Sequence, residues 1–214
     1  MGIHSQFPGD LKVTVRDIYD AYAKRYDRRL GIMELLGIGE RRRSLLRHAR
    51  GRVLEVAVGT GMNLSHYGPD VELHAVDFSE EMIQQAKHKA LRMGRQIFLH
   101  AMDAERLAFA DQSFDTVVST LSTCTFPSPV VAMREMGRVV RPGGVILLME
   151  QGYSDRRWLR MLQDLRAERQ FQWLRCRWKR EPHLQAEEAG LRIESDDRIW
   201  LGMIHVMVLR PSGA

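Results

Sequence analysis

The chain has 214 residues, 44% of them hydrophobic and 28% charged, and a formal net charge of +5. This length suits one α/β domain with a buried core, and no apolar run approaches the ~20 residues that a membrane-spanning helix needs. The N-terminus shows no charged-then-apolar leader and two cysteines cannot form a disulfide framework, so we expect a cytoplasmic location. No zinc-ligand spacing is present, and no metal site is predicted.

The positive charge is concentrated in one segment. Between residues 155 and 180, nine Lys or Arg residues stand against three acidic residues, so this segment carries +6 and the rest is close to neutral. An anionic membrane surface, nucleic acid and plain solvent are all compatible with such a segment.

The chain is expected to begin with a loose arm over residues 1–12. From Val13, apolar and tyrosine residues recur at helical spacing, which predicts a helix with tyrosines on one face. These rings either cover an edge of the core or face a ligand. Three glycines, Gly31, Gly37 and Gly39, are expected to interrupt the helix.

A second helix is predicted over residues 40–48. Its Arg41, Arg42 and Arg43 are placed on or near the solvent side, because an arginine triplet is more often a solvated face than a binding site.

The stretch around Gly59-Thr60-Gly61 organises the rest of the chain. A run of β-branched and apolar residues ends there and a helix-compatible stretch follows, which predicts a buried strand, a tight turn and a crossover helix. Glycines allow positive φ and close approach of the backbone to a ligand. No third glycine follows in phase, so the pattern alone is weak. Glu55, near the end of the strand, could face an ammonium group such as that of a methionine moiety.

Further strands alternate with helices. Strands are predicted over 71–76, 96–101, 113–119 and 145–149, with helices over 80–93 and 129–140 between them. Such alternation predicts a parallel sheet with right-handed crossovers and a ligand outside the carboxyl ends of its strands.

Polar residues stand where these strands end. Asp77 is spaced to accept hydrogen bonds from the two hydroxyls of a ribose, and Phe78 could lie against an adenine. Asp103 either accepts from an exocyclic amine or caps a helix; both interpretations stay open.

The C-terminal part is predicted to contain a basic helix over 154–175 and a short helix from Pro182 to Gly190. Two strands, 191–199 and 202–210, are close enough to form an antiparallel pair that closes the sheet.

Taken together, these motifs resemble class I S-adenosylmethionine (SAM)-dependent methyltransferases of methyltransferase domain type 11. The matching stretches are LEVAVGTG (54–61), AVD at Asp77, MDAERLAF (102–109), SFDTVVSTL (113–121) and REMGRVVRPGG (134–144). Similar groups include ubiquinone/menaquinone-biosynthesis enzymes, bacterial phosphatidylethanolamine N-methyltransferases and alkyl-thiol methyltransferases.

The resemblance implies an α/β fold with a Rossmann-like, doubly wound, seven-stranded sheet. The sheet would be mostly parallel with an antiparallel C-terminal strand and helices on both faces. Residues 1–50 would be an N-terminal helical cap of the same domain and 51–214 the methyltransferase domain proper. SAM would be the cofactor and S-adenosyl-L-homocysteine the product.

The resemblance also implies roles for individual residues. The candidate catalytic or positioning groups are Tyr19, Tyr26 and Thr123, with Glu150 as a further candidate and Cys124 as a buried filler. His183, just after a helix-opening proline, is a candidate too, but a surface position is the more common one for such a residue. The implied cofactor contacts are Tyr26, Glu55, Gly59, Thr60, Gly61, Asn63, Asp77, Phe78, Met82, Asp103, Ala104, Glu105 and Thr120.

The predicted function is in-line SN2 transfer of a methyl group to a small hydrophobic or lipid-like acceptor: a phospholipid headgroup amine, a thiol or a quinone-type ring. Alternatives are a non-catalytic SAM-binding regulatory protein and an RNA methyltransferase, the latter suggested only by the pI of about 9.5. A small molecule or lipid is the expected partner, nucleic acid is not, and the basic segment could contact the inner membrane surface peripherally. The sequence specifies neither the acceptor atom nor the oligomeric state.

Overall fold

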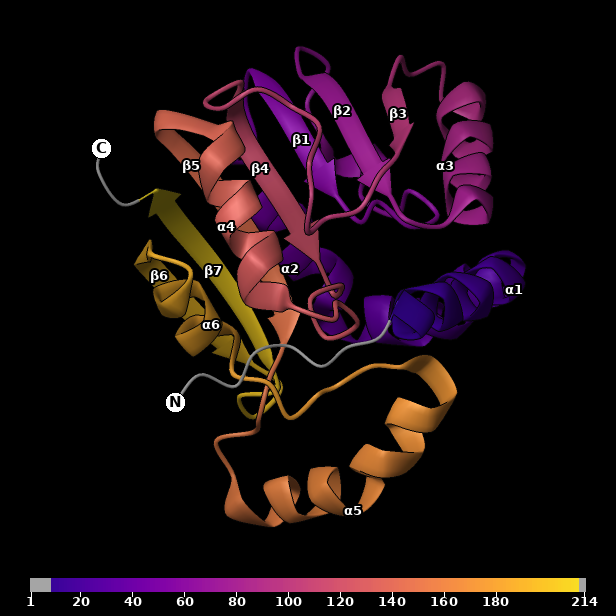
Figure 1. Ribbon diagram of the computed structural model, residues 1–214, viewed down its shortest axis with the longest axis vertical. Helices are drawn as coiled ribbons and strands as arrows, with labels where there is room; N and C mark the ends of the chain where they lie inside the picture. The colour runs from indigo at the N-terminus through magenta and orange to yellow at the C-terminus, as the bar shows by residue number, and fades with distance from the viewer. Residues whose placement is uncertain (1–8, 212–214) are drawn as a thin grey trace.

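A computed structural model describes residues 9–211 of the chain, whose centre is one seven-stranded sheet with the strand order β3-β2-β1-β4-β5-β7-β6 (Figure 1). The strands are β1 (Arg52–Val56), β2 (Glu72–Asp77), β3 (Phe98–Ala101), β4 (Phe114–Thr120), β5 (Val140–Gln151), β6 (Leu191–Ile199) and β7 (Ile204–Pro211).

The topology places a natural ligand site between β1 and β4. Strand β1 pairs in parallel with β2 on one side and with β4 on the other, so the chain reverses its direction of winding there. Ligands on open α/β sheets bind outside the carboxyl ends of the strands at such a switch point. Strand β7 lies between β5 and β6 and is antiparallel to both, which confirms the predicted fold class and the C-terminal pair.

Helices cover both faces of the sheet. The helices are α1 (Gly9–Met33), α2 (Gly39–Leu46), α3 (Glu80–Arg92), α4 (Pro129–Val139), α5 (Arg157–Leu174) and α6 (Pro182–Glu188). Helices α4 and α6 bury their apolar residues on one face, while α2 and α3 bury theirs on the other. Helix α1 crosses below the carboxyl ends of β1 and β2, and α5 projects beyond it (Figure 1). Within residues 9–211, no helix has the length and hydropathy required to span a bilayer.

The N-terminal helices differ from the prediction in two ways. Residues 9–12 belong to α1 instead of a loose arm, and α1 runs through Gly31 to Met33; the expected break at Gly31 was wrong, whereas residues 1–8 lie outside the described part. The interruption comes later, in a π-helical segment over Glu34–Ile38, where Leu36 and Gly37 leave helical geometry and Gly37 has φ +108°. Gly37 is the residue that can adopt this backbone without strain.

The predicted crossover helix after β1 is also wrong. The chain there makes turns closed by three-residue hydrogen bonds, from Gly61 N–H to Val58 and from Leu64 N–H to Gly61, and a 3-10 helix over Leu64–His66. Tyr67 then returns to the strand, because its hydroxyl donates to Glu55 Oε2 at 2.8 Å. This contact holds the connection close to β1, where it forms tight turns in place of a regular α-helix.

The other predicted elements are confirmed within a few residues. Ser79 caps α3 by accepting from Met82 N–H at 3.1 Å. Strand β5 is the exception, because it begins at Val140, five residues before the predicted strand. Gly143 within it has φ +75°, and the pairing of β5 with β4 shifts register between Phe114 and Thr116.

Candidate functional site

A cavity of about 830 Å³, including the open solvent at its mouth, lies at the carboxyl ends of the central strands and is also lined by residues of α1. Ten of the predicted site residues line it: Tyr19, Tyr26, Gly59, Asp77, Phe78, Met82, Asp103, Ala104, Glu105 and Thr120. Residues from four separate strand ends and from α1 therefore share one space, as the sheet topology predicts.

A smaller cavity of about 310 Å³ adjoins the first and shares Tyr26, Ala57 and Gly59 with it. Three more predicted residues, Glu55, Thr60 and Asn63, line this second space. The two cavities follow β1 and the glycine turn, so an elongated ligand could extend from one into the other.

Two predicted residues, Gly61 and Thr123, line neither cavity. A Cβ on Gly61 would lie 2.6 Å from Leu64 Cδ1, and φ is +79° there, so this glycine is needed for packing of the turn. Thr123 is buried behind the wall of the larger cavity, where its N–H donates to Glu150 Oε2 at 3.1 Å.

Asp77 and Gly59 form the polar corner of the larger cavity. Asp77 accepts from Gly59 N–H through Oδ2 at 2.7 Å and from Ser79 N–H through Oδ1 at 2.9 Å. Burial raises the pKa of Asp77 to about 6, although these N–H groups counteract the shift. Gly59 has φ +55° and open space where a Cβ would stand. The corner thus offers an acceptor carboxylate beside a backbone that a ligand can approach closely.

Glu55 is held at the bottom of the smaller cavity. It accepts from Asn63 Nδ2 and from the Tyr67 hydroxyl, both at 2.8 Å. Burial raises the pKa of Glu55 to about 7, against the opposing effect of these two donors. A cationic group entering the cavity would favour the ionised carboxylate. Tyr67 was missed from the sequence because nothing local marks it as a partner of Glu55.

Arg42 lies in a different environment from the one that the sequence predicted. It was placed on or near the solvent side, yet its side chain is only 3% exposed and lines the smaller cavity. Its guanidinium donates to Asn63 Oδ1 at 2.6 Å, to Thr120 Oγ1 at 2.7 Å and to the Glu34 carboxylate. The neighbouring Arg41 and Arg43 are exposed, as predicted.

Helix α1 is attached to the two turns that bound the cavity. Asp20 accepts a hydrogen bond from the Ser79 hydroxyl, and Asp27 accepts one from the Thr60 hydroxyl. Lys89 of α3 adds an ion pair to Asp27 at 2.9 Å. Asp20 and Asp27 directly follow Tyr19 and Tyr26 in the chain. The two aspartates therefore fix α1, while the two tyrosines face the cavity.

The rings of Tyr19 and Tyr26 lie close together, with centroids 6.3 Å apart. Burial raises the pKa of both phenols well above the usual 10. At neutral pH they are uncharged hydrogen-bond donors.

The outer wall is fixed by Asp103 and Glu105. Asp103 Oδ1 accepts from Glu105 N–H at 2.9 Å, so it both lines the cavity and caps the turn that follows β3. Glu105 Oε1 accepts from Ser128 N–H at 2.6 Å. Across the cavity, the Arg16 guanidinium lies 4.3 Å from the centroid of Phe78, a cation–π contact that the sequence did not reveal.

Glu150 supports the loop after β4 from inside the protein. The carboxylate is fully buried and accepts from Ser122 N–H at 3.0 Å as well as from Thr123 N–H. Burial raises the pKa of Glu150 to about 7, with Thr123 opposing the shift. Glu150 lines neither cavity, so its place is that of a loop support.

We expect Glu150→Gln to change how stability depends on pH. A carboxyl whose folded-state pKa is raised stabilises fully below its unfolded pKa of about 4.5, and this contribution is lost as pH rises through about 7. Relative to the variant, the wild type should therefore lose about 3 kcal/mol of unfolding free energy over this interval. Urea unfolding of both proteins at several pH values measures the difference. Glu187→Gln, at an exposed site, is the control; parallel curves for wild type and Glu150→Gln would contradict the assignment.

The two cysteines form a buried pair. Cys176 Sγ donates to Cys124 Sγ at 2.8 Å, and the Arg177 N–H donates to the Cys124 carbonyl at the same distance. The hydrogen bond from Cys176, and then burial, raise the pKa of the Cys124 thiol well above its usual range. Such a thiol is a poor nucleophile, in line with its prediction as a buried filler.

We expect both thiols to react slowly with an aromatic disulfide reagent in the native protein. The rate should be at least about tenfold below that of the same protein in denaturant, because both thiols are buried and the raised pKa of Cys124 leaves less thiolate there. The absorbance of the thiolate that the reagent releases measures this rate. A rapid phase equal to one thiol per chain would show that the pair opens readily.

Comparison with known proteins agrees with this geometry. Residues 54–148 match a family model described as a methyltransferase domain. A phosphatidylethanolamine N-methyltransferase of Cereibacter sphaeroides is 41% identical over 108 residues, 50% of this chain and 53% of that protein. A demethylmenaquinone methyltransferase of Deinococcus radiodurans is 34% identical over 148 residues, 66% of this chain and 61% of that protein. The chain thus spans little more than half the length of these curated relatives.

A solved SAM-dependent methyltransferase from Thermotoga maritima has the same fold, with a TM-score of 0.68 at 18% identity; the match covers 92% of this chain and all of that one. Sheet order, cavity and strand-end residues together define the class as the Rossmann-like methyltransferase fold. Residues 54–148 therefore match a methyltransferase domain and share the fold of SAM-dependent methyltransferases, and SAM is the cofactor that this likeness implies.

Proposed function

We propose that the chain is an enzyme that transfers the methyl group of SAM to a small apolar or lipid-like acceptor. The observation that carries the proposal is the corner formed by Asp77 and Gly59, inside a cavity that also receives the ends of β1, β3 and β4. A non-catalytic SAM-binding protein would need the same corner to hold the cofactor. The experiment below must therefore detect transfer of the methyl group, not binding alone.

The residues present fit the cofactor. Asp77 would accept from the ribose hydroxyls, and Phe78 and Asp103 would bound the adenine. Glu55 and the turn at Gly59 would hold the methionine end, where the ammonium group would keep Glu55 ionised. When bound, SAM supplies a methyl group already activated by its sulfonium. The protein's own contribution is then alignment and exclusion of water.

Tyr19 and Tyr26 are the best candidates for positioning the acceptor. Both lie in the cavity wall, and their raised pKa values keep them protonated, so they donate hydrogen bonds and do not serve as bases. Thr123, behind the wall, would act only by holding the loop over 121–127 in place.

The surface of helix α5 is the reason for proposing a lipid-like acceptor. Five large apolar side chains, all exposed, lie within an arc of about 120° on this helix, because successive residues are about 100° apart: Trp158, Met161, Leu162, Leu165 and Trp173. Exposed Arg157 and Arg166 flank the arc, and exposed Arg169 lies within it. An apolar stripe bordered by cations is the pattern of a helix that lies on an anionic bilayer surface.

The test combines turnover with membrane binding. Purified protein with methyl-labelled SAM is incubated with phosphatidylethanolamine vesicles, a demethylated quinone and a long-chain thiol, and products are identified by mass. The phospholipid amine is the first acceptor to test, because the relative at 41% identity carries that name. Cofactor binding without label transfer to any of the three acceptors would refute the proposal, and transfer abolished by ribonuclease in a crude mixture would point to RNA.

A further inference from the structure

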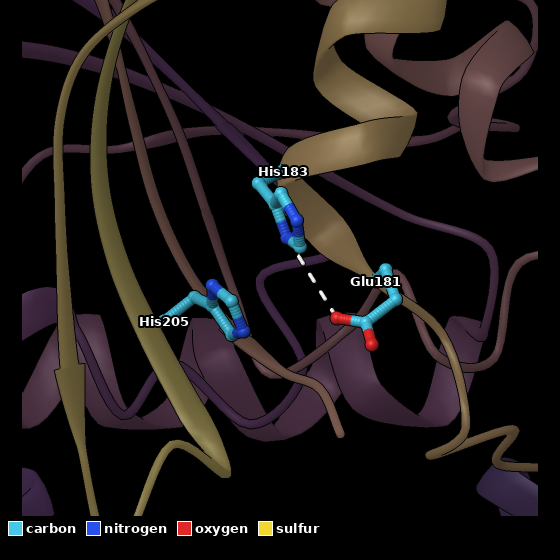
Figure 2. Close-up of side chains that lie close together, drawn as sticks. All are labelled: Glu181, His183 and His205. Carbon is cyan, nitrogen blue, oxygen red and sulfur yellow. Dashed lines mark ion pairs between the residues drawn. The ribbon is translucent and has the colours of Figure 1, made fainter. Parts of the chain in front are cut away.

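A cluster of ligand-type side chains lies away from the cavity, where α6 begins next to β7. It consists of Glu181, His183 and His205, which we call the His–Glu cluster, and one ligand atom from each lies within 4.8 Å of the other two. Figure 2 shows the two imidazoles and the carboxylate turned toward one another. His183 Nδ1 is 3.7 Å from a Glu181 oxygen, and the two rings stack with centroids 5.4 Å apart.

Two imidazole nitrogens in this cluster are buried without a hydrogen-bond partner. They are His183 Nδ1 and His205 Nε2. A buried polar atom left unpaired costs about 1–3 kcal/mol, and a bound ion is one of the explanations for such an atom in a folded protein. The His205 side chain is completely buried, so water from the surface does not reach it in this arrangement.

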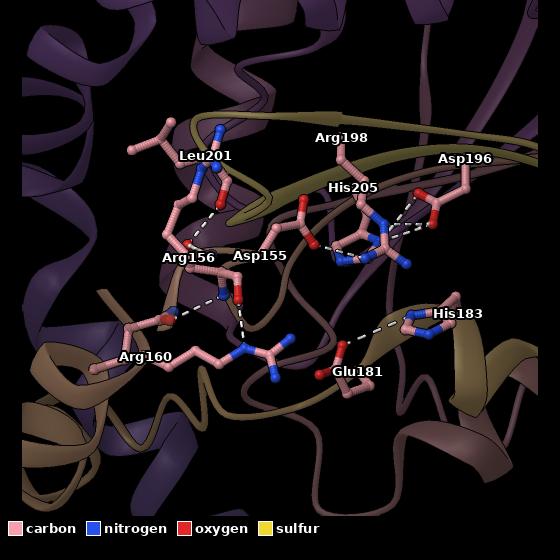
Figure 3. Close-up of polar contacts among 11 residues, drawn as sticks. Asp155, Arg156, Arg160, Glu181, His183, Asp196, Arg198, Leu201 and His205 are labelled. Atoms are coloured by element: carbon pink, nitrogen blue, oxygen red, sulfur yellow. Dashed lines mark hydrogen bonds and ion pairs between the residues drawn. The ribbon is translucent and has the colours of Figure 1, made fainter. Parts of the chain in front are cut away.

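The second nitrogen of His205 is already fixed. Its Nδ1 lies 3.0 Å from both oxygens of Asp196, which Arg198 also contacts (Figure 3). The carboxylate holds the proton on Nδ1 and thereby leaves the lone pair on Nε2 pointing away from Asp196. A carboxylate that orients a histidine in this way is the usual support of a metal-binding imidazole.

Gly152 packs directly against the imidazole of His205. A Cβ added to Gly152 would lie 2.7 Å from His205 Nε2 and 3.0 Å from Pro182 Cδ. A side chain at position 152 would therefore force His205 or Pro182 to shift.

We propose that Glu181, His183 and His205 bind a divalent transition-metal ion, with Zn²⁺ as the best fit. Two imidazole nitrogens and one carboxylate oxygen form a ligand set that zinc accepts with tetrahedral geometry, leaving a fourth position for water. Tetrahedral ligands of zinc are about 3.3 Å apart, so the 3.7 Å pair is nearly in place and the others need to close by at most about 1.5 Å. One of the two stacked imidazoles must also turn, because the lone pair of each donor nitrogen lies in the plane of its ring.

The site would fix the segment between α5 and α6. Glu181 ends that segment, and its Arg177 and Arg180 reach the carbonyls of Cys124 and Thr123 on the loop that borders the larger cavity. His205 stands on β7, within the sheet. An ion held by all three side chains would attach this segment to the sheet, which is a structural role separate from methyl transfer.

The sequence did not reveal this site because its ligands are far apart in the chain. Glu181 and His183 lie at the start of α6, whereas His205 lies on β7, and the whole of β6 comes between them. Zinc motifs recognised by spacing need their ligands in close pairs along the chain. Here only Glu181 and His183 are close.

The test is metal binding by the full chain, without an affinity tag and after treatment with a chelator. Zn²⁺ is titrated by calorimetry, and Co²⁺ is used as a visible probe of tetrahedral coordination. We expect one ion per chain and an affinity that falls at least about tenfold in Glu181→Gln and in His183→Gln. His88→Gln, at an exposed site on α3, is the matched control and should bind as the wild type does.

His205→Gln and Asp196→Asn extend the test, but these positions are more buried and the variants could misfold. The half-buried Glu181 and His183 keep the experiment decisive, because their replacement at the start of α6 leaves the core intact. Zn²⁺ binding of equal strength in wild type and in both of these variants would overturn the proposal, and so would absence of binding to the wild type. Since the readout is metal binding, the result is independent of whether methyl transfer is found.

Discussion

Replacing Asp77 by asparagine should weaken binding of S-adenosyl-L-homocysteine by about 100-fold. The ionised carboxylate would accept two hydrogen bonds from the ribose, each worth about 1.5–3 kcal/mol when the acceptor is charged, and a tenfold change in affinity corresponds to about 1.4 kcal/mol. The amide also places a donor against the N–H of Gly59 or Ser79. Calorimetric titration with the product measures the change.

The control for this variant is Asp70→Asn, at an exposed position before β2. Thermal unfolding of each variant shows whether the protein is folded when its affinity is measured. If folded Asp77→Asn binds the product within about threefold of wild type, the assignment of Asp77 to the ribose is wrong.

Arg42→Met should be the most destabilising single change near the site. The guanidinium is buried and paired with Glu34, and removal of one partner of a buried ion pair costs about 3–5 kcal/mol. Asn63 Oδ1 loses its donor in the same variant, so affinity for the cofactor should fall as well. Urea unfolding gives the stability and calorimetry the affinity.

The arginine triplet supplies its own control. Arg41→Met changes an exposed side chain of the same type in the same helix and should stay within about 0.5 kcal/mol of wild type. Adding Glu34→Gln to Arg42→Met removes the other partner and should restore part of the stability. Equal effects at positions 41 and 42 would contradict the buried network.

The sheet and most of the site could be predicted because they depend on local patterns. Apolar runs fix the strands, parallel winding brings their carboxyl ends together, and Gly59, Asp77 and Asp103 follow from their places at those ends. The family resemblance added Tyr19 and Tyr26, which the structure does place in the cavity wall.

What the sequence missed depends on contacts between distant segments. Arg42 has the same local surroundings as its two exposed neighbours, and only the approach of Asn63 and Thr120 separates it from them. The connection after β1 looked helical because its residues favour a helix, but the hydrogen bond from Tyr67 to Glu55 folds it back. Tertiary contacts override local preference in both cases.

The break in helical geometry at Leu36 and Gly37 has a consequence for how the cavity opens. Arg42 lies beyond the break and the bonds of Asp20 and Asp27 lie before it, while the ion pair between Arg42 and Glu34 crosses it. Helix α1 should therefore swing outward about a hinge at these two residues only when this ion pair breaks together with the bonds of Asp20 and Asp27. Backbone amides of α1 should then exchange with deuterated solvent through a local opening, well before those of β1 and β4.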